Sequence, residues 1–291
     1  MNCTDILPKD ILNEAVNAIC SRYKIGHESV LKQMNETMHR HPELIKKIQK
    51  NPVDITRLKA YKTFIKDVKK QIYYQLRQYH QNTAQETDLK QHLASLVLNQ
   101  GPSDDIDKII KGLLSSHVST QERLPWYQEF YQTLFNLVDP GKSIIDIGCG
   151  IHPLSYPFEK NNLNTYLAID KDPVVIDTLT IFAPRVAPVK LIPVCMDINH
   201  ITWSDYLTAQ FDLAFVLKLI PVLHRQNKSA LKQLIEIPAK QILLTGNIEA
   251  MTRKETIRRK ERRMLQDFIA MTGRQISGNF EVGNEFGFVI R

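Results

Sequence analysis

The chain has 291 residues, enough for two domains, and 43% of them are hydrophobic, so a core of ordinary size is available. The formal net charge of +7 indicates a polyanionic partner if the cations cluster. The first residues lack the pattern of a signal peptide, and no apolar run is long enough to span a membrane. The four cysteines have neither C-x-x-C nor zinc-ligand spacing. The composition therefore argues against a disulfide framework and a metal site, and predicts a cytoplasmic protein.

Residues 5–115 are predicted to be almost entirely helical, because apolar residues recur at helical spacing and glycine is rare. The most informative segment is Thr56 to His80, where residues three or four positions apart form one apolar face. That face comprises Leu58, Tyr61, Ile65, Val68, Ile72, Leu76 and Tyr79.

Lysines occupy the remaining surface of this helix, namely Lys59, Lys62, Lys66, Lys69 and Lys70. A charge run is usually a solvated face. Here, however, only Asp54 and Asp67 offset the cations between residues 46 and 80, and like charges on one face repel each other unless a polyanion is present. The segment therefore predicts a surface that binds RNA phosphates. Tyr73 and Tyr74 are able to stack on bases, although tyrosine in an amphipathic helix is more often a core residue.

The stretch from Lys142 to Leu154 organises the second half of the chain. β-branched residues lead directly into Gly148-Cys149-Gly150, which predicts a buried parallel strand and then a tight turn. Glycines suit such a turn because the backbone can take φ > 0 and approach a ligand closely. A dinucleotide site requires G-x-G-x-x-G, but Pro153 occupies the third small position, and no Gly-Lys-Ser/Thr follows to make a P-loop. An ordinary strand-to-helix turn remains the alternative.

Two further predicted strands each end in an acid, Leu163 to Asp170 and Val189 to Asp197. A carboxylate at the tip of the second strand is placed to accept both ribose hydroxyls of a nucleoside. Phe211 to Ile220 and Gln241 to Gly246 are predicted as the fourth and fifth strands. Strands that alternate with helices indicate βαβ units and a parallel sheet.

Four segments of the chain carry a family resemblance: HVSTQERL at 117–124, IIDIGCGIHPL at 144–154, LKLIPVLHR at 217–225 and, more loosely, NEFGFVIR at 284–291. They resemble the Arm/Rmt family of aminoglycoside-resistance methyltransferases. Members of that family use S-adenosylmethionine to modify N7 of a decoding-site guanine of 16S rRNA within the 30S subunit. The resemblance covers about residues 115–291, whereas the N-terminal half matches only as a basic helical domain.

The resemblance implies an α/β fold, in which a Rossmann-like class I methyltransferase sheet follows an all-α N-terminal domain. Residues 1–115 would bind RNA or the ribosome, and residues 116–291 would form the S-adenosylmethionine-dependent methyltransferase domain. Seven strands are expected. The last two are Arg274 to Val282 and Glu285 to Arg291, which would close as a hairpin around Gly283-Asn284.

By the same resemblance, Arg123 would hold the carboxylate of the cofactor's methionine end, as a guanidinium fork does. Asp170 would accept the ribose hydroxyls, and Asp197 with Ile198 would flank the adenine. Cys149 is expected to be a small packing residue and not a nucleophile. The complete predicted cofactor site is Arg123, Asp146, Gly148, Cys149, Gly150, Asp170, Lys171, Asp197, Ile198 and Leu217.

The resemblance also implies a chemistry without a general base, because guanine N7 carries an in-plane lone pair that can attack the sulfonium methyl group directly. Positioning would then be the main catalytic device. Lys218, at the mouth of the fourth strand, would face the place where the base enters and act as an electrostatic residue on the substrate side or the cofactor side, unless it is only a solvated strand tip. The chain lacks the N/D-P-P-Y/F sequence of exocyclic-amine methyltransferases and the Pro-Cys or Thr-Cys nucleophile of cytosine-C5 methyltransferases.

The segment after the fifth strand departs from the family, whose members have a Ser-Phe-Pro-like turn and a glycine-containing basic loop there. This chain has Thr245-Gly246-Asn247 and then Ile248 to Met264, a basic stretch without glycine or proline. That stretch is predicted to be one continuous helix, which is either an RNA clamp or a solvated face. The clamp residues would be Arg253, Lys254, Arg258 and Arg259. A second departure is His152, which stands where the family has asparagine.

Three hypotheses follow. The first is a monomeric 16S rRNA (guanine-N7)-methyltransferase that acts on the 30S subunit and confers aminoglycoside resistance. The second is a methyltransferase with another rRNA position or another acceptor. The third is an RNA-binding module whose cofactor site is silent, against which the intact set of loop glycines and strand-tip acids argues.

Overall fold

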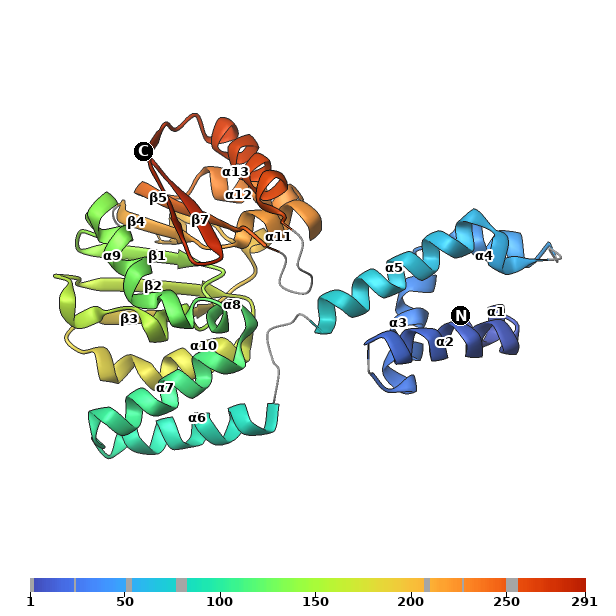
Figure 1. The fold of residues 1–291 in the computed structure, drawn as a ribbon, viewed down its shortest axis with the longest axis horizontal. Helices are drawn as coiled ribbons and strands as arrows, with labels where there is room; N and C mark the ends of the chain where they lie inside the picture. Colours follow the sequence, from blue (N-terminus) through green and yellow to red (C-terminus); the bar gives the residue numbers. More distant parts are fainter. Residues whose placement is uncertain are drawn as a thin grey trace. The chain divides into compact units, whose positions relative to one another are not determined.

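The computed structural model describes residues 3–23, 25–50, 54–76, 83–206, 210–226, 228–249 and 256–291. The chain divides into two compact units, Met1–His80 and Gln81–Arg291. The described part of the first unit is helical, and the second unit is built on a β-sheet (Figure 1).

The first unit packs its helices around an apolar core of its own. The predicted basic helix is present as α5, and its residues Tyr61, Val68 and Ile72 are buried together with Phe64. Residues 77–80 of the predicted segment lie outside the described residues, as do the side chains of Tyr73 and Tyr74. The elements are α1 (Cys3–Ile6), α2 (Lys9–Tyr23), α3 (His27–Met38), α4 (Pro42–Ile48), the 3-10 turn η1 (Ile55–Arg57) and α5 (Lys59–Leu76).

The second unit contains a seven-stranded sheet in the order β3-β2-β1-β4-β5-β7-β6. Strands β1 to β5 are parallel, and β7 runs antiparallel between β5 and β6. All seven predicted strands are present, and the β6–β7 hairpin turns at Gly283, whose φ of +55° suits glycine. The strands are β1 (Ser143–Ile147), β2 (Thr165–Asp170), β3 (Lys190–Cys195), β4 (Phe211–Val216), β5 (Ala239–Asn247), β6 (Ile276–Val282) and β7 (Glu285–Ile290).

Helices cover both faces of this sheet because its strands are apolar on both sides. Alternate strand residues enter two separate cores, as Tyr166 and Leu167 of β2 show. One core contains residues of α6 (Thr83–Leu98), α7 (Ser103–Ser116), α9 (Tyr127–Leu137) and α10 (Pro173–Phe182). The other contains residues of α11 (Leu219–Gln226), α12 (Leu231–Ile235) and α13 (Arg258–Thr272).

Short elements connect these layers. They are α8 (Val118–Gln121) and the 3-10 turns η2 (Leu124–Trp126), η3 (His152–Ser155), η4 (Phe158–Lys160), η5 (Ala183–Val186), η6 (Ile198–His200), η7 (Trp203–Tyr206) and η8 (Lys228–Ala230).

The division between the units lies earlier in the chain than the predicted boundary at residues 115 and 116. Helices α6 and α7 belong to the sheet unit, because Leu93, Ile106, Leu113 and Leu114 are buried in the core that α9 and α10 share. Their sequence is helical like that of the first unit, so composition alone could not assign them to the sheet.

The prediction of one continuous helix from Ile248 to Met264 is wrong. Glu249 pairs with Thr256 in an isolated antiparallel bridge, and the Ile257 amide donates to the Ile248 carbonyl at 2.8 Å. Helix α13 therefore begins only at Arg258 and continues to Thr272, beyond the predicted end. Its left-handed C-terminal residue is Gly273, with φ of +67°.

Candidate functional site

The glycine loop follows β1 at the carboxyl edge of the parallel strands. Gly148 and Gly150 have φ of +65° and +51°, a conformation that glycine adopts without strain. The amides of Gly148 and Cys149 donate to the Ile169 carbonyl at 2.8 and 3.1 Å, which ties the loop to β2. A side chain at Gly148 would come within 3.1 Å of Leu219, whereas one at Gly150 would meet nothing within 4 Å. The open side of the loop is thus at Gly150.

Asp170, at the tip of β2, faces this loop. Its carboxylate accepts the Gly150 amide at 2.8 Å through Oδ2 and the Asp172 amide at 3.0 Å through Oδ1. Burial raises the pKa of this carboxyl group, and the two amide hydrogen bonds oppose that effect. Each carboxylate oxygen can accept more than one hydrogen bond, so both retain capacity for a diol.

Asp197 follows β3 on the same edge and caps the turn η6. Its Oδ1 accepts the backbone amide of Asn199 at 2.9 Å, and this hydrogen bond is the main reason why its pKa is lowered. Of the other predicted residues, Ile198 and Leu217 are half-buried, and Lys171 is exposed. The carboxyl edge therefore brings together the loop glycines and both strand-tip acids, as the sequence predicts.

Two cysteines lie beside this edge in different environments. Cys149 is buried within the loop, and burial raises the pKa of its thiol, so it is a packing residue. Cys195 is exposed, and it pairs in register with Asp170 across β2 and β3.

A buried polar chain lies beneath the loop. Oδ2 of Asp146 accepts from the Tyr166 hydroxyl at 2.8 Å and contacts Nδ1 of His152 at 2.8 Å. The other ring nitrogen of His152 lies 2.8 Å from the Tyr131 hydroxyl, so the departure at His152 links the loop to α9. Oδ1 of Asp146 is buried without a hydrogen-bond partner among the described residues. An unpartnered buried acceptor costs about 1–3 kcal/mol, which a ligand's ammonium group would relieve.

Arg123 is engaged by a residue that the sequence did not single out. Its Nε and Nη2 donate to the Glu285 carboxylate at 2.9 and 2.7 Å, and both side chains are 5% exposed. Burial alone would raise the pKa of Glu285, but Arg123 and Lys218 outweigh it and lower this pKa to about 2. Arg123 thus holds the carboxylate of Glu285 in β7, whereas the predicted partner was the carboxylate of the cofactor's methionine end. The sequence feature that could have indicated Glu285 is its position as a single acid at the start of an otherwise apolar last strand.

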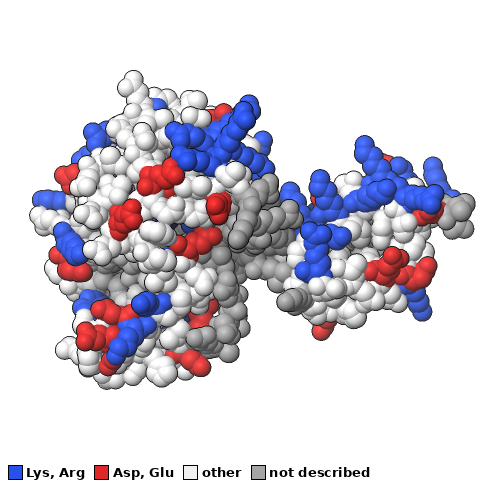
Figure 2. Space-filling view, in the orientation of Figure 1, with Lys and Arg blue, Asp and Glu red and all other residues white. Residues whose placement is uncertain are grey.

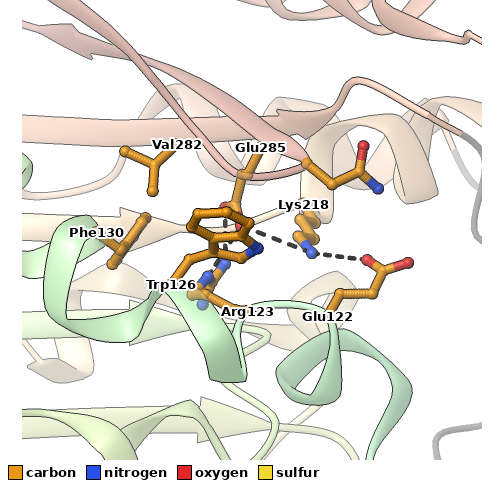
Figure 3. A pocket seen from close by; sticks show the side chains of 8 residues that line it. Glu122, Arg123, Trp126, Phe130, Lys218, Val282 and Glu285 are labelled. Atoms are coloured by element: carbon orange, nitrogen blue, oxygen red, sulfur yellow. Dashed lines mark hydrogen bonds and ion pairs between the residues drawn. The ribbon is translucent and has the colours of Figure 1, made fainter.

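Lys218 stands between two carboxylates at the end of β4 (Figure 3). Its ammonium lies 3.1 Å from Oε2 of Glu122 and 3.6 Å from Oε2 of Glu285. The backbone of Lys218 is left-handed, with φ of +57°, and its amide donates to Thr245 at 3.0 Å. Such a conformation costs about 1–3 kcal/mol for a non-glycine residue and clusters at functional sites.

A small pocket opens at this charge cluster, and the indole of Trp126 lies across it (Figure 3). Trp126 is 42% exposed, and Phe130 lies beneath the Arg123 guanidinium at 4.6 Å from its ring centre. The pocket is lined by Glu122, Arg123, Trp126, Phe130, Lys218, Val282, Asn284 and Glu285.

The predicted RNA-binding lysines of the first unit lie on the outer side of α5. Lys59, Lys62, Lys66 and Lys70 are exposed and Lys69 is half-buried. Figure 2 shows Lys and Arg gathered along this helix.

In the second unit the predicted clamp is only partly described. Arg253 and Lys254 lie outside the described residues. Arg258 is paired with Glu281, its Nη1 lying 3.2 Å from Oε1, so its charge is already neutralised. Arg259 is exposed on α13.

No helix within the described ranges is both long and apolar enough to cross a membrane. The same residues contain no group of three or more His, Cys, Asp or Glu side chains placed to hold a metal ion.

Comparison with known proteins identifies relatives of this chain. A 16S rRNA (guanine(1405)-N(7))-methyltransferase of Proteus mirabilis is 27% identical over 187 residues, which are 61% of this chain and 63% of that protein. An enzyme of the same name from Micromonospora rosea is 26% identical over 216 residues, 70% of this chain and 73% of that one. A third, from Micromonospora echinospora, matches over 52% of its length. The chain thus matches about half to three quarters of these relatives.

Solved structures share the fold. The 16S rRNA methylase RmtB aligns over 96% of this chain and 98% of its own, with a TM-score of 0.56 and 20% identity. The 16S rRNA methyltransferase RmtF, in complex with S-adenosyl-L-homocysteine, aligns over 98% of this chain and 99% of its own, with a TM-score of 0.57 and 16% identity. The class I methyltransferase fold expected from the sequence is thereby confirmed.

The model of the ribosomal RNA methyltransferase family FmrO matches residues 40–265. That match extends over more than half of the chain and includes the glycine loop and the ends of strands β1 to β5. The chain therefore belongs to the FmrO family of ribosomal RNA methyltransferases.

Proposed function

We propose that this protein transfers the methyl group of S-adenosylmethionine to N7 of a decoding-site guanine of 16S rRNA in the 30S subunit. The observation that carries the proposal is the carboxyl edge itself, where Gly150, Asp170 and Asp197 meet within the region that the family model matches. The names of the curated relatives support the choice of acceptor. Cytoplasmic action as a monomer and aminoglycoside resistance belong to the same proposal.

The residues at this edge fit the cofactor. Gly148 and Gly150 would pass beneath its methionine end, and Oδ1 of Asp146 would receive its ammonium group. Asp170 would accept the ribose hydroxyls, while Asp197, Lys171, Ile198 and Leu217 would surround the adenine. The fork of Arg123 is occupied by Glu285, so only its Nη1 end remains for the cofactor's carboxylate. When bound, the cofactor supplies an electrophilic methyl group.

The protein's own contribution is positioning and electrostatics. Guanine N7 needs no base to remove a proton, but the ring becomes positively charged as N7 is methylated. The carboxylates of Glu122 and Glu285 would stabilise that charge, and Lys218 holds both in place and would donate to guanine O6. The exposed lysines of α5 would supply phosphate contacts that offset the cost of flipping the base, about a few kcal/mol.

A second candidate is methylation of another rRNA position. The observation that favours it is the segment after β5, where Gly246-Asn247 and the Glu249–Thr256 bridge replace the family's turn and loop. Substrate-facing loops determine specificity. A different segment after β5 therefore favours a different target nucleotide.

Methyl transfer from labelled S-adenosylmethionine to 30S subunits and to protein-free 16S RNA tests the proposal. The labelled base is then mapped by strand scission specific for N7-methylguanine. Scission at a decoding-site guanine in 30S subunits is expected. Labelling without scission would favour the second candidate. Absence of labelling in both substrates, with cofactor binding intact, would refute rRNA methylation.

A further inference from the structure

Among the residues that the structure describes, the second unit carries a group of cations without an acidic ion-pair partner. Of the cations on α13 and the neighbouring α11, Arg258 pairs with Glu281 and Arg225 with Glu261, while Arg262 lies over the Phe288 ring at 5.2 Å. Arg259, Lys260 and Arg263 are exposed, and within the described ranges none of them forms an ion pair. Figure 2 shows Lys and Arg side chains gathered on the surface around α13.

Helix α11 and the turn after it extend this patch. Burial lowers the pKa of His224, and Lys228, Arg225 and Lys260 lower it further against the opposing charge of Asp267. Cations from both helices therefore act on the same imidazole, and the two helices contact each other. We define the α11–α13 surface as His224, Lys228, Arg259, Lys260 and Arg263.

This surface is fixed rigidly to the carboxyl edge. Glu261 of α13 is buried, accepts the Asn247 amide at 2.6 Å at the end of β5, and pairs with Arg225 of α11 at 2.9 Å. Helix α11 begins immediately after Lys218, and five residues of helix rise separate Leu219 from His224, about 7–8 Å. His224 of this surface thus lies within about two helical turns of the residue proposed to face the acceptor base.

The arrangement is costly for a protein without a polyanionic partner. Arg259 and Lys260 lie in the first turn of α13, where the helix dipole disfavours cations, and Ile257 supplies no side-chain cap. Like charges also repel across α11 and α13. A feature that opposes local stability and has no acidic partner among the described residues is expected where function requires it.

We propose that the α11–α13 surface binds the sugar–phosphate backbone next to the nucleotide that enters the catalytic site. The inference rests on the proposed function, since a flipped base stays covalently tied to its flanking phosphates and brings them to the surface beside the site. The contacts are independent of sequence and separate from those of α5. They give the catalytic unit an RNA-binding surface of its own.

The test is a triple variant, Arg259→Glu, Lys260→Glu and Arg263→Glu, in the full chain. Its matched control is Lys111→Glu, Lys160→Glu and Lys190→Glu, three exposed cations elsewhere on the same unit whose replacement changes the net charge equally. Affinity for 30S subunits and for protein-free 16S RNA is measured over a series of salt concentrations. Thermal melting and affinity for S-adenosylhomocysteine report folding. A Gln triple at the same positions replaces the Glu triple if that variant does not fold.

The surface variant is expected to bind both RNA substrates at least about tenfold more weakly, and its slope of log affinity against log salt should be about 2 smaller, since each phosphate contact contributes about 0.7–0.9. The control should retain affinity and slope. Equal loss of affinity in both variants, or no loss in either, would overturn the proposed RNA-binding role of the surface. Methylation of 30S subunits by the wild type would still uphold the proposed function. Loss confined to 30S subunits would assign the surface to an acidic ribosomal protein and also overturn the inference. If the wild type binds RNA through this surface but does not methylate it, the RNA-binding role of the surface stands and the proposed function is wrong.

Discussion

Asp170 holds two segments of the fold together and is also proposed to bind the cofactor. Its two oxygens fix the glycine loop through Gly150 and the start of α10 through Asp172, and both retain lone pairs. Removing the carboxylate should abolish the two proposed hydrogen bonds to the ribose, which are worth about 1–1.5 kcal/mol of binding free energy each. Asp170→Ala is therefore expected to weaken cofactor affinity about 30-fold or more, measured by calorimetry, with RNA affinity retained.

Asp172→Ala is the control for this substitution. The Asp172 side chain caps α10 by accepting from Val174 at 2.9 Å, so its loss should cost about 1 kcal/mol of stability and leave cofactor affinity unchanged. Unaltered affinity in the Asp170 variant would remove this residue from the cofactor site.

Glu285 predicts a pH dependence of stability. Its pKa is about 2 in the folded protein, below the ordinary 4.5, so the folded state favours the ionised form. The stabilisation is complete above about pH 4.5 and is lost as the pH falls towards 2; it amounts to about 3 kcal/mol for a shift of this size. Urea unfolding of the wild type should show this loss, and Glu285→Gln should show a correspondingly smaller one. Parallel pH profiles for the two proteins would contradict the assignment.

At the scale of elements, the cations in the first turn of α13 are expected to lower the stability of the helix while they favour RNA binding. Arg259→Glu or Lys260→Glu replaces a cation with an anion at the positive end of the helix dipole, which is worth about 0.3–1 kcal/mol each. Each variant should therefore melt at a higher temperature than the wild type while binding RNA more weakly. Lys190→Glu, on β3, should not increase the melting temperature. A lower melting temperature in both α13 variants would contradict the argument.

The same scale shows what the sequence could predict. The first five strands were predictable because apolar runs bounded by glycine and acid allow few other structures, whereas the last two strands and the hairpin at Gly283 were expected from the family resemblance. The break before α13 was not, because Glu249 and Thr256 pair through their backbones, which no side-chain pattern encodes. The Arg123–Glu285 pair was missed for a similar reason, since its partners lie far apart in the chain and meet only after the sheet forms.

For the whole molecule, the division into units predicts which fragments fold. Residues 81–291 contain the complete sheet core. A fragment of residues 116–291 would lose Leu93, Ile106, Leu113 and Leu114, whose burial contributes about 1.5–3 kcal/mol each. The sum is comparable with the total stability of a domain, about 5–15 kcal/mol.

The longer fragment is accordingly expected to unfold cooperatively and to bind S-adenosylhomocysteine, and the shorter one to remain unfolded. Circular dichroism and calorimetry would distinguish them. Equal stability of both fragments would place α6 and α7 outside the sheet core after all.

The contrast between the cysteines has a practical consequence. Cys149 is buried with a raised thiol pKa, and burial raises that of Cys3 to about 12, so neither presents a reactive thiolate. Of the other two cysteines, Cys20 is half-buried, and Cys195 is exposed and pairs in register with Asp170 of the neighbouring strand. A fluorescent maleimide should therefore label the native protein preferentially at Cys195, without an introduced cysteine. Saturating S-adenosylhomocysteine should slow that labelling, so the labelling rate would report occupancy of the cofactor site in real time.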